Sequence, residues 1–159
     1  MSAETDLIAK FYEAFGKKDA DTMGSCYADT IRFSDPVFPD LEGEHARAMW
    51  KMLCGRSKDL TVVASDIAWD GERGTAKWVA NYTFGATGRK VENRIAATFR
   101  IEDGKIVQHD DVFDFWRWSR QALGPAGLLL GWSPMLLGKV RKQAAQSLRE
   151  YEAKQAKKA

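Results

Sequence analysis

The chain has 159 residues, of which 45% are hydrophobic and 29% are charged, and its formal net charge at pH 7 is +2. This length suffices for one well-packed core and is too short for two ordinary domains. Because the net charge is small and the basic residues are scattered until the last twenty positions, we expect no nucleic acid as the main partner.

The N-terminal residues and the two cysteines bear on the compartment. Cys26 and Cys54 lie in segments that read as helical and lack metal-ligand spacing, so we expect buried free thiols in a reducing environment. Glu4 and Asp6 stand where a signal peptide would carry positive charge, and no apolar run reaches membrane-spanning length. The prediction is a soluble cytoplasmic protein.

The first third of the chain has the apolar spacing of helices. Ile8, Phe11 and Phe15 recur at helical intervals and predict a first helix, after which Asp19 can cap a short second helix. A third helix is expected over residues 44–53. A single strand is predicted between the second and third helices.

Asp35 is a carboxylate on the apolar face of that strand, which covers residues 27–36. Side chains alternate between the two faces of a strand, so Ile31, Phe33 and Asp35 point together. A carboxylate in such a place is either a structural acid that caps a turn or a base with a raised pKa. The sequence leaves both interpretations open.

From Leu60 onward the hydrophobic period changes to two, which predicts a meander of long strands. The last strand, over residues 105–115, would place Val107, His109, Asp111 and Phe113 on one side. Three helices followed by antiparallel strands indicate an α+β fold, with the helices on one face of a curved sheet.

The stretch over residues 123–137 is apolar but interrupted by glycine and proline, and it is too short to span a bilayer. Its leucines and Trp132 would be costly in water as one patch. We expect it to cover the open mouth of the sheet or its helices, or to join a dimer interface. Contact with a membrane surface is the secondary alternative, because a basic helix from Lys139 to Lys158 follows.

Several segments between residues 4 and 115 match one known fold family. They are the helix over residues 8–15, Asp19, Tyr27-Ala28-Asp29, Phe33-Ser34-Asp35-Pro36, Gly43 and residues 99–107. In these segments the chain resembles the nuclear transport factor 2-like superfamily, which includes SnoaL-type polyketide cyclases and ketosteroid isomerases. The family hosts enzymes and non-enzymes alike.

The resemblance implies a cone-shaped, curved antiparallel sheet packed with three N-terminal helices over residues 1–115. Residues 116–159 would add a C-terminal helical extension to the same domain. The resemblance further implies a mostly apolar pocket for a small hydrophobic molecule and a homodimer.

Asp35 matches the base that shuttles a proton in the isomerases of this family. The two hydrogen-bond donors of the isomerase oxyanion hole fall on Phe11 and Ala97, which cannot donate. Losing such donors costs orders of magnitude in rate, so a standard steroid isomerase is not expected.

His109 and Asp111 offer an alternative, because they project into the same space from the last strand. A neighbouring carboxylate and burial shift the pKa of an imidazole in opposite directions, so the pair could be poised near neutral pH. Asp35, His109 and Asp111 are therefore the candidate catalytic residues. The alternative for His109 is a satisfied core histidine.

The remaining site residues would contact the ligand. Tyr82 and Asn93 could donate hydrogen bonds to a carbonyl. The expected lining of the pocket is Phe11, Trp50, Ala97 and Phe113. No metal-ligand or phosphate-loop pattern occurs in the sequence, so we predict no metal and no other cofactor.

Three functions are compatible with these residues. The first is an isomerase, cyclase or dehydratase that abstracts a proton next to a carbonyl. The second is a non-catalytic protein that binds a lipid or metabolite. The third is a dimerisation module whose cone is filled by its own aromatic side chains.

Overall fold

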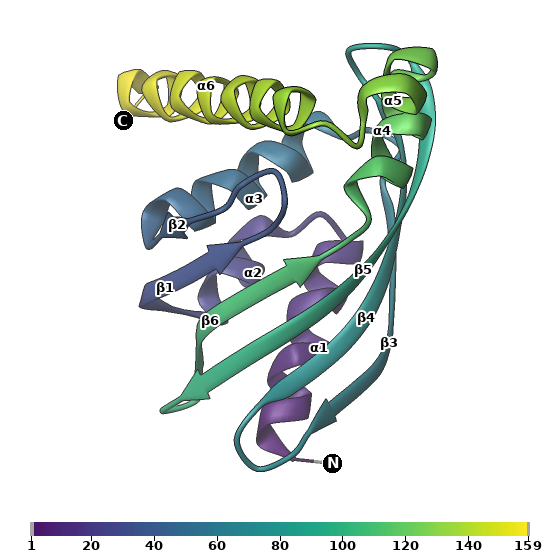
Figure 1. The fold of residues 1–159 in the computed structure, drawn as a ribbon. Coiled ribbons are helices and arrows are strands. Elements are labelled where there is room, and N and C mark those ends of the chain that lie inside the picture. Colours follow the sequence, from purple (N-terminus) through teal and green to yellow (C-terminus); the bar gives the residue numbers. More distant parts are fainter. Residues whose placement is uncertain (1, 159) are drawn as a thin grey trace.

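The structure is a computed structural model that describes residues 2–158, and Figure 1 shows its ribbon. The helices are α1 (Ala3–Gly16), α2 (Ala20–Ser25), α3 (Glu44–Arg56), α4 (Phe115–Leu123), α5 (Pro125–Leu130) and α6 (Pro134–Lys158). The strands are β1 (Tyr27–Ser34), β2 (Leu41–Glu42), β3 (Thr61–Trp69), β4 (Gly74–Phe84), β5 (Arg89–Glu102) and β6 (Lys105–Val112).

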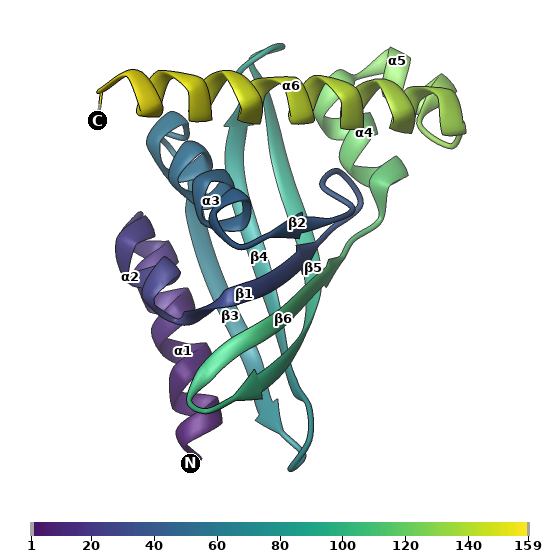
Figure 2. The ribbon, with the colours of Figure 1, turned by 90° about the vertical axis from the view of Figure 1, so that its left-hand side faces the viewer.

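The strands form one curved sheet in the order β2-β1-β6-β5-β4-β3 (Figure 2). Neighbouring strands are antiparallel except β1 and β6, which run parallel. The predicted α+β class is confirmed, but the sheet is mixed rather than wholly antiparallel. The reason is that β1 and β6 are far apart in the chain, so no tight turn forces them to run in opposite directions.

The three N-terminal helices lie on the concave side of this sheet (Figures 1 and 2). Helix α1 begins after Ser2, whose hydroxyl accepts a hydrogen bond from Thr5 N at 3.1 Å. The buried stripe of α1 includes Ile8, Phe11 and Phe15, as the sequence predicted. This stripe faces the sheet and starts the core.

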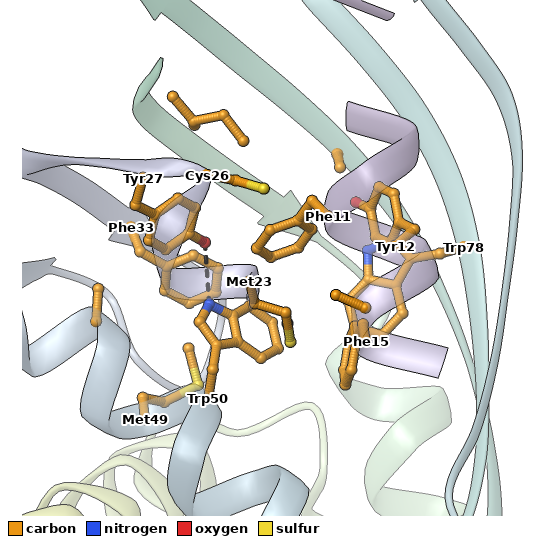
Figure 3. Packing of buried hydrophobic residues seen from close by; sticks show 14 of the residues in the cluster. Phe11, Tyr12, Phe15, Met23, Cys26, Tyr27, Phe33, Met49, Trp50 and Trp78 are labelled. Atoms are coloured by element: carbon orange, nitrogen blue, oxygen red, sulfur yellow. Dashed lines mark hydrogen bonds between the residues drawn. The ribbon is translucent and has the colours of Figure 1, made fainter. Parts of the chain in front are cut away.

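Aromatic side chains fill the deep part of the cone (Figure 3). Phe15 of α1 contacts Trp50 of α3 and Trp78 of β4 edge-on, with ring centroids 5.0 and 5.3 Å apart. Phe33 of β1 contacts the other side of Trp50 at 5.3 Å. Edge-to-face pairs of this kind stabilise a core beyond the area they bury.

A bulge in β6 changes which residues of that strand face inward. Arg100 pairs with Gln108 while Ile101 pairs with Ile106, so one residue of β6 is left over. Ile106 is consequently buried, whereas Val107 is only half-buried. The prediction that Val107 shares a face with His109 was wrong, because simple alternation does not hold across a bulge.

Two parts of the C-terminal extension pack onto the cone. Helix α4 lies against β5, where Trp118 and Ala122 form a second buried cluster with Val91. Helix α6 crosses above α3 (Figure 2), burying Leu148 and donating a hydrogen bond from Arg141 Nε to the Pro36 carbonyl at 2.8 Å. The extension therefore packs on β5 through α4, and on α3 and the turn after β1 through α6.

The apolar stretch between them does not cover the cone within one chain. Leu129 is 68% exposed and Trp132 is 73% exposed, so the expectation that this stretch covers the mouth of the sheet or its helices was wrong. The dimer interface and the membrane contact stay predictions. Within residues 2–158, no helix is long and apolar enough to cross a membrane.

Candidate active site

The candidate residues lie on one inward face of the sheet, in successive rows. Pairing across the sheet puts His109 level with Phe33 and Phe99 at the deep end. Asp111 is level with Ala97 in the next row. Asn93 and Tyr82 follow on the inward face of β5 and β4, toward the rim. The sequence correctly placed these side chains on a common face.

His109 is fully buried and both of its ring nitrogens are occupied. Its Nδ1 lies 2.7 Å from the Tyr27 hydroxyl, and its Nε2 lies 2.9 Å from Asp111 Oδ1. Trp50 Nε1 donates to the Tyr27 oxygen at 2.9 Å, and Trp78 Nε1 donates to Asp111 Oδ1 at 3.4 Å. These five side chains form a continuous buried network.

The direction of the hydrogen bonds fixes the tautomer of the imidazole. An indole can only donate and a carboxylate can only accept, so Tyr27 accepts from Trp50 and Asp111 accepts from His109 Nε2. In a neutral ring with its proton on Nε2, Nδ1 accepts the hydroxyl hydrogen of Tyr27. This is the arrangement of a satisfied core histidine, the alternative that the sequence left open.

Asp35 lies just beyond the end of β1 and is half-buried. Its Oδ1 accepts hydrogen bonds from Val37 N at 2.7 Å and Phe38 N at 2.6 Å, so the carboxyl caps a turn. Within residues 2–158, its Oδ2 receives no hydrogen bond. One oxygen thus holds the turn while the other is left to take a proton.

Burial raises the pKa of Asp35 to about 7, and the charge of Asp111 adds to this effect. The hydrogen bonds from Phe38 N and Val37 N and the nearby His109 act in the opposite direction without cancelling it. The turn cap and the raised pKa therefore coexist in one residue. A carboxylate with a pKa near the working pH suits general base catalysis.

Tyr82 stands half-buried on β4 near the rim and is held by α4. Its oxygen accepts a hydrogen bond from Trp118 Nε1 at 2.7 Å, which leaves the phenolic hydrogen free to donate. Burial raises the pKa of Tyr82; the bond from Trp118 opposes this shift, and the charge of Asp35 adds to it.

The predicted lining residues divide into two groups. Phe11, Trp50 and Ala97 are packed inside the aromatic core and are at most 2% exposed. Asn93 and Phe113 are half-buried. The half-buried members of the candidate site consequently lie toward the rim, as do Asp35 and Tyr82.

Two relevant side chains escaped the sequence interpretation. Trp118 positions Tyr82 from a helix that the pattern did not assign to the site. Tyr12 has a buried hydroxyl without a hydrogen-bond partner in the described part of the chain. Burial raises the pKa of Tyr12, with a further contribution from the charge of Asp111. Neither residue has a sequence signal beyond being aromatic.

Two hollows open on the outer surface. The first, of about 570 Å³, is lined by Arg89, Lys90, Arg117, Arg120 and Gln121. The second, of about 550 Å³, lies beside α2 and α3 and includes Arg47 and Lys105. Neither is lined by the candidate catalytic residues. Among residues 2–158, no group of three or more His, Cys, Asp or Glu side chains is arranged to hold a metal ion.

Comparison with known proteins agrees with this architecture. The model of the SnoaL-like domain family matches residues 8–109. No curated protein matches the sequence significantly.

Solved structures share the fold. IdmH from Streptomyces antibioticus, a candidate polyketide cyclase, is 25% identical and superposes with a TM-score of 0.62, covering 73% of this chain and 95% of its own. An LEH-like epoxide hydrolase from M. tuberculosis is 20% identical with a TM-score of 0.66, covering 80% and 96%. A hypothetical protein with a ketosteroid isomerase-like fold from Catenulispora acidiphila, in complex with trimethylamine, is 15% identical with a TM-score of 0.67, covering 80% and 97%.

Proposed function

We propose that this chain, which belongs to the SnoaL-like domain family of the nuclear transport factor 2-like superfamily, abstracts a proton from a small hydrophobic ketone. The proton would be taken from the carbon next to the carbonyl of a ring-bearing substrate. The observation that carries this proposal is Asp35, a half-buried carboxyl at the rim whose pKa is raised to about 7. The reaction would be of the isomerase, cyclase or dehydratase type.

Asp35 would act as the base through Oδ2. Because Oδ1 is fixed by Val37 N and Phe38 N, the carboxyl plane is held in place before a ligand arrives. A pKa near 7 means that the ionised form is available at neutral pH and still binds a proton strongly enough to remove one from carbon.

Tyr82 would supply the hydrogen bond that Phe11 and Ala97 cannot. Its hydroxyl is oriented by Trp118, and its free hydrogen can stabilise negative charge that develops on a carbonyl oxygen. Asn93 lies on the same inward face and offers a second donor. Both side chains are at the accessible end of the cone.

The network of His109 and Asp111 would position rather than react. The imidazole is fully buried and both of its nitrogens are hydrogen-bonded, so neither nitrogen is free to exchange a proton with a substrate. Asp111 nevertheless contributes to the raised pKa of Asp35. In this proposal the charge of Asp111 helps to raise the pKa of Asp35, and the hydrogen bond from His109 keeps Asp111 in position.

The first test is proton–deuterium exchange at the carbons next to the carbonyl of bicyclic ketones, with 2-tetralone as the initial probe, followed by NMR in deuterated buffer. The exchange rate should exceed that of buffer and should level off above an apparent pKa of about 7. A rate equal to buffer at every pH, or one that rises with hydroxide without levelling, contradicts the proposal.

A second test addresses the donor. Tyr82→Phe removes only the hydroxyl, so we expect the exchange rate to fall by about a hundredfold with little change in ketone affinity. Tyr151→Phe, a half-buried tyrosine on α6 away from the rim, is the matched control and should keep the wild-type rate. If both variants exchange at the wild-type rate, the carbonyl is not bound by Tyr82.

A non-catalytic module is the second candidate, and it is favoured by one observation. The deep cone is filled by the chain's own aromatic side chains, including Phe11, Trp50 and Phe99. On this interpretation ketones would neither bind nor exchange, and the raised pKa of Asp35 would be a by-product of its turn. The exchange experiment separates the two candidates directly.

Location and assembly are part of the proposal. The thiols of Cys26 and Cys54 are free and buried, which fits the reducing environment of a cytoplasmic protein. The homodimer and the hydrophobic ligand implied by the family resemblance are retained as proposals. Light scattering of the purified chain measures the first.

A further inference from the structure

Helix α5 exposes its three leucines and buries Gly127, and Gly131, which ends the helix, is buried as well. Gly127 and Gly131 face Ser119 of α4 so closely that a side chain at either position would collide with Ser119. Ser119 itself is fully buried. Because only glycine fits this contact, the leucines of α5 are directed away from the protein.

The result is an exposed apolar tip, which we define as Leu128, Leu129, Leu130, Trp132 and Met135. Their exposed fractions are 52%, 68%, 43%, 73% and 64%. They fall within eight consecutive residues, and together they form the kind of patch that marks an interaction site. Since α5 is anchored through its glycines, the exposure does not result from a failure to pack.

The surroundings of the apolar tip are basic. Between Asp114 and Glu150 the chain has no acidic residue. It has six basic residues there, which are Arg117, Arg120, Lys139, Arg141, Lys142 and Arg149. Such a run beside an apolar surface complements a surface that is apolar inside and negatively charged outside.

Trp116 contacts both a residue that lines the basic hollow of about 570 Å³ and a residue of the apolar tip. The guanidinium carbon of Arg120, which lines the hollow, lies 4.1 Å from the centroid of the Trp116 ring. Trp116 Nε1 in turn donates to the Leu128 carbonyl at 3.2 Å. Glu92, 3.7 Å from Arg117, is the acidic neighbour of the hollow.

The charge of the hollow is positive, because Arg89, Lys90 and Arg117 line it together with Arg120. Guanidinium and ammonium groups bind phosphate oxygens by charge-assisted hydrogen bonds. Cationic side chains beside the apolar tip point to phosphate next to hydrocarbon.

We propose that the apolar tip and the basic hollow form a docking surface for a lipid bilayer with anionic headgroups. The leucines and Trp132 enter the boundary between headgroups and acyl chains, while the cations of the hollow bind headgroup phosphates. Tryptophan is favoured at this depth because its ring is apolar and its N–H is polar. The helix α6, which follows the tip, continues the basic surface.

A second copy of the chain is a poorer occupant of this surface. A two-fold interface would bring the same residues of both copies together. Both copies would then bring Lys139 and the cations of the hollow into one interface, and like charges brought together oppose association. A bilayer offers the complementary charge instead. This inference does not depend on Asp35 being a base.

The test is co-flotation of the full chain with vesicles of phosphatidylcholine, compared with vesicles of phosphatidylcholine and phosphatidylglycerol in equal parts. The chain should float with the anionic vesicles, and raising the salt concentration should weaken this binding. No flotation, or equal flotation with both vesicles, overturns the proposal.

Variants locate the binding surface. Leu129→Ser combined with Trp132→Ser should lower binding to anionic vesicles at least tenfold, whereas Val63→Ser, at a valine that is 66% exposed on β3, should leave it unchanged. Lys90→Gln combined with Lys139→Gln should lower binding to anionic vesicles by about fivefold per charge removed. The control pair, Lys154→Gln with Lys157→Gln, removes the same charge at the far end of α6 and should lower this binding by clearly less.

The competing occupants give distinct results. If light scattering without vesicles shows a dimer that the Leu129→Ser and Trp132→Ser pair dissociates, and the wild type does not float, the apolar tip is a protein interface. If the control pair at Lys154 and Lys157 loses as much binding as the pair at Lys90 and Lys139, attraction is by general charge and the docking surface is wrong.

Discussion

Asp35→Asn is expected to lower the rate of ketone proton exchange by about 10²–10⁴-fold and, above pH 7, to make the folded protein more stable. Asparagine retains an oxygen for the hydrogen bonds from Val37 N and Phe38 N, so the turn after β1 should persist. It cannot accept a proton from carbon at neutral pH. Activity and stability should therefore change in opposite directions.

The stability gain follows from the direction of the pKa shift. Burial, reinforced by Asp111, raises the pKa of Asp35 from 3.8 to about 7. Between these values the folded chain retains a proton that the unfolded chain has lost. The contribution of Asp35 to stability is thus fully present below pH 3.8 and is lost as the pH rises through about 7. Asparagine carries no charge, so we expect a gain of about 1–3 kcal/mol at pH 8.

Urea unfolding at pH 5 and pH 8, together with the exchange assay, measures both effects. Asp110→Asn is the matched control, because Asp110 pairs with Ser34, the residue before Asp35, and accepts hydrogen bonds from Ser34 and Gln108 instead. It should not reproduce the loss of exchange. A variant at Asp35 that keeps wild-type exchange rules out the base. A stability difference that is the same at both pH values contradicts the raised pKa.

Periodicity predicted the face on which the site lies but not which members of that face are accessible. His109, Asp111, Tyr82 and Asn93 share the inward face because side chains alternate along strands, and this needs no tertiary information. The saturation of His109 comes from Tyr27, 82 residues away. Such a contact depends on the parallel pairing of β1 and β6, which no local pattern encodes.

The same limit applies at the rim and at the C-terminus. Trp118 reaches Tyr82 from 36 residues away, so the residue that frees the phenolic hydrogen could not be identified from spacing. The leucines of α5 looked like core residues because they are apolar. Their exposure is decided by the contact of Gly127 with Ser119. A glycine in the sequence does not indicate which residue will pack against it.

The buried network around His109 should contribute strongly to stability, and Tyr27→Phe tests this with the loss of a single oxygen. Removing that hydroxyl leaves Trp50 Nε1 without an acceptor and His109 Nδ1 without a donor. Both groups are fully or almost fully buried, so no water replaces the lost partner. We expect the free energy of unfolding to fall by about 2–4 kcal/mol, measured by urea unfolding.

Tyr12→Phe is the matched control in the same core, and the opposite result is expected. The Tyr12 hydroxyl is buried but has no hydrogen-bond partner among residues 2–158. Its removal therefore leaves no group unpaired, and it also removes the free-energy cost of burying a polar oxygen away from water. The variant should be as stable as the wild type or more stable by about 1 kcal/mol. An equal loss of stability in both variants would contradict the assignment, because a hydroxyl without a partner would then stabilise the core as much as one within the network. A loss confined to Tyr27→Phe assigns the stabilisation to the network that holds His109 and Asp111 beneath the rim.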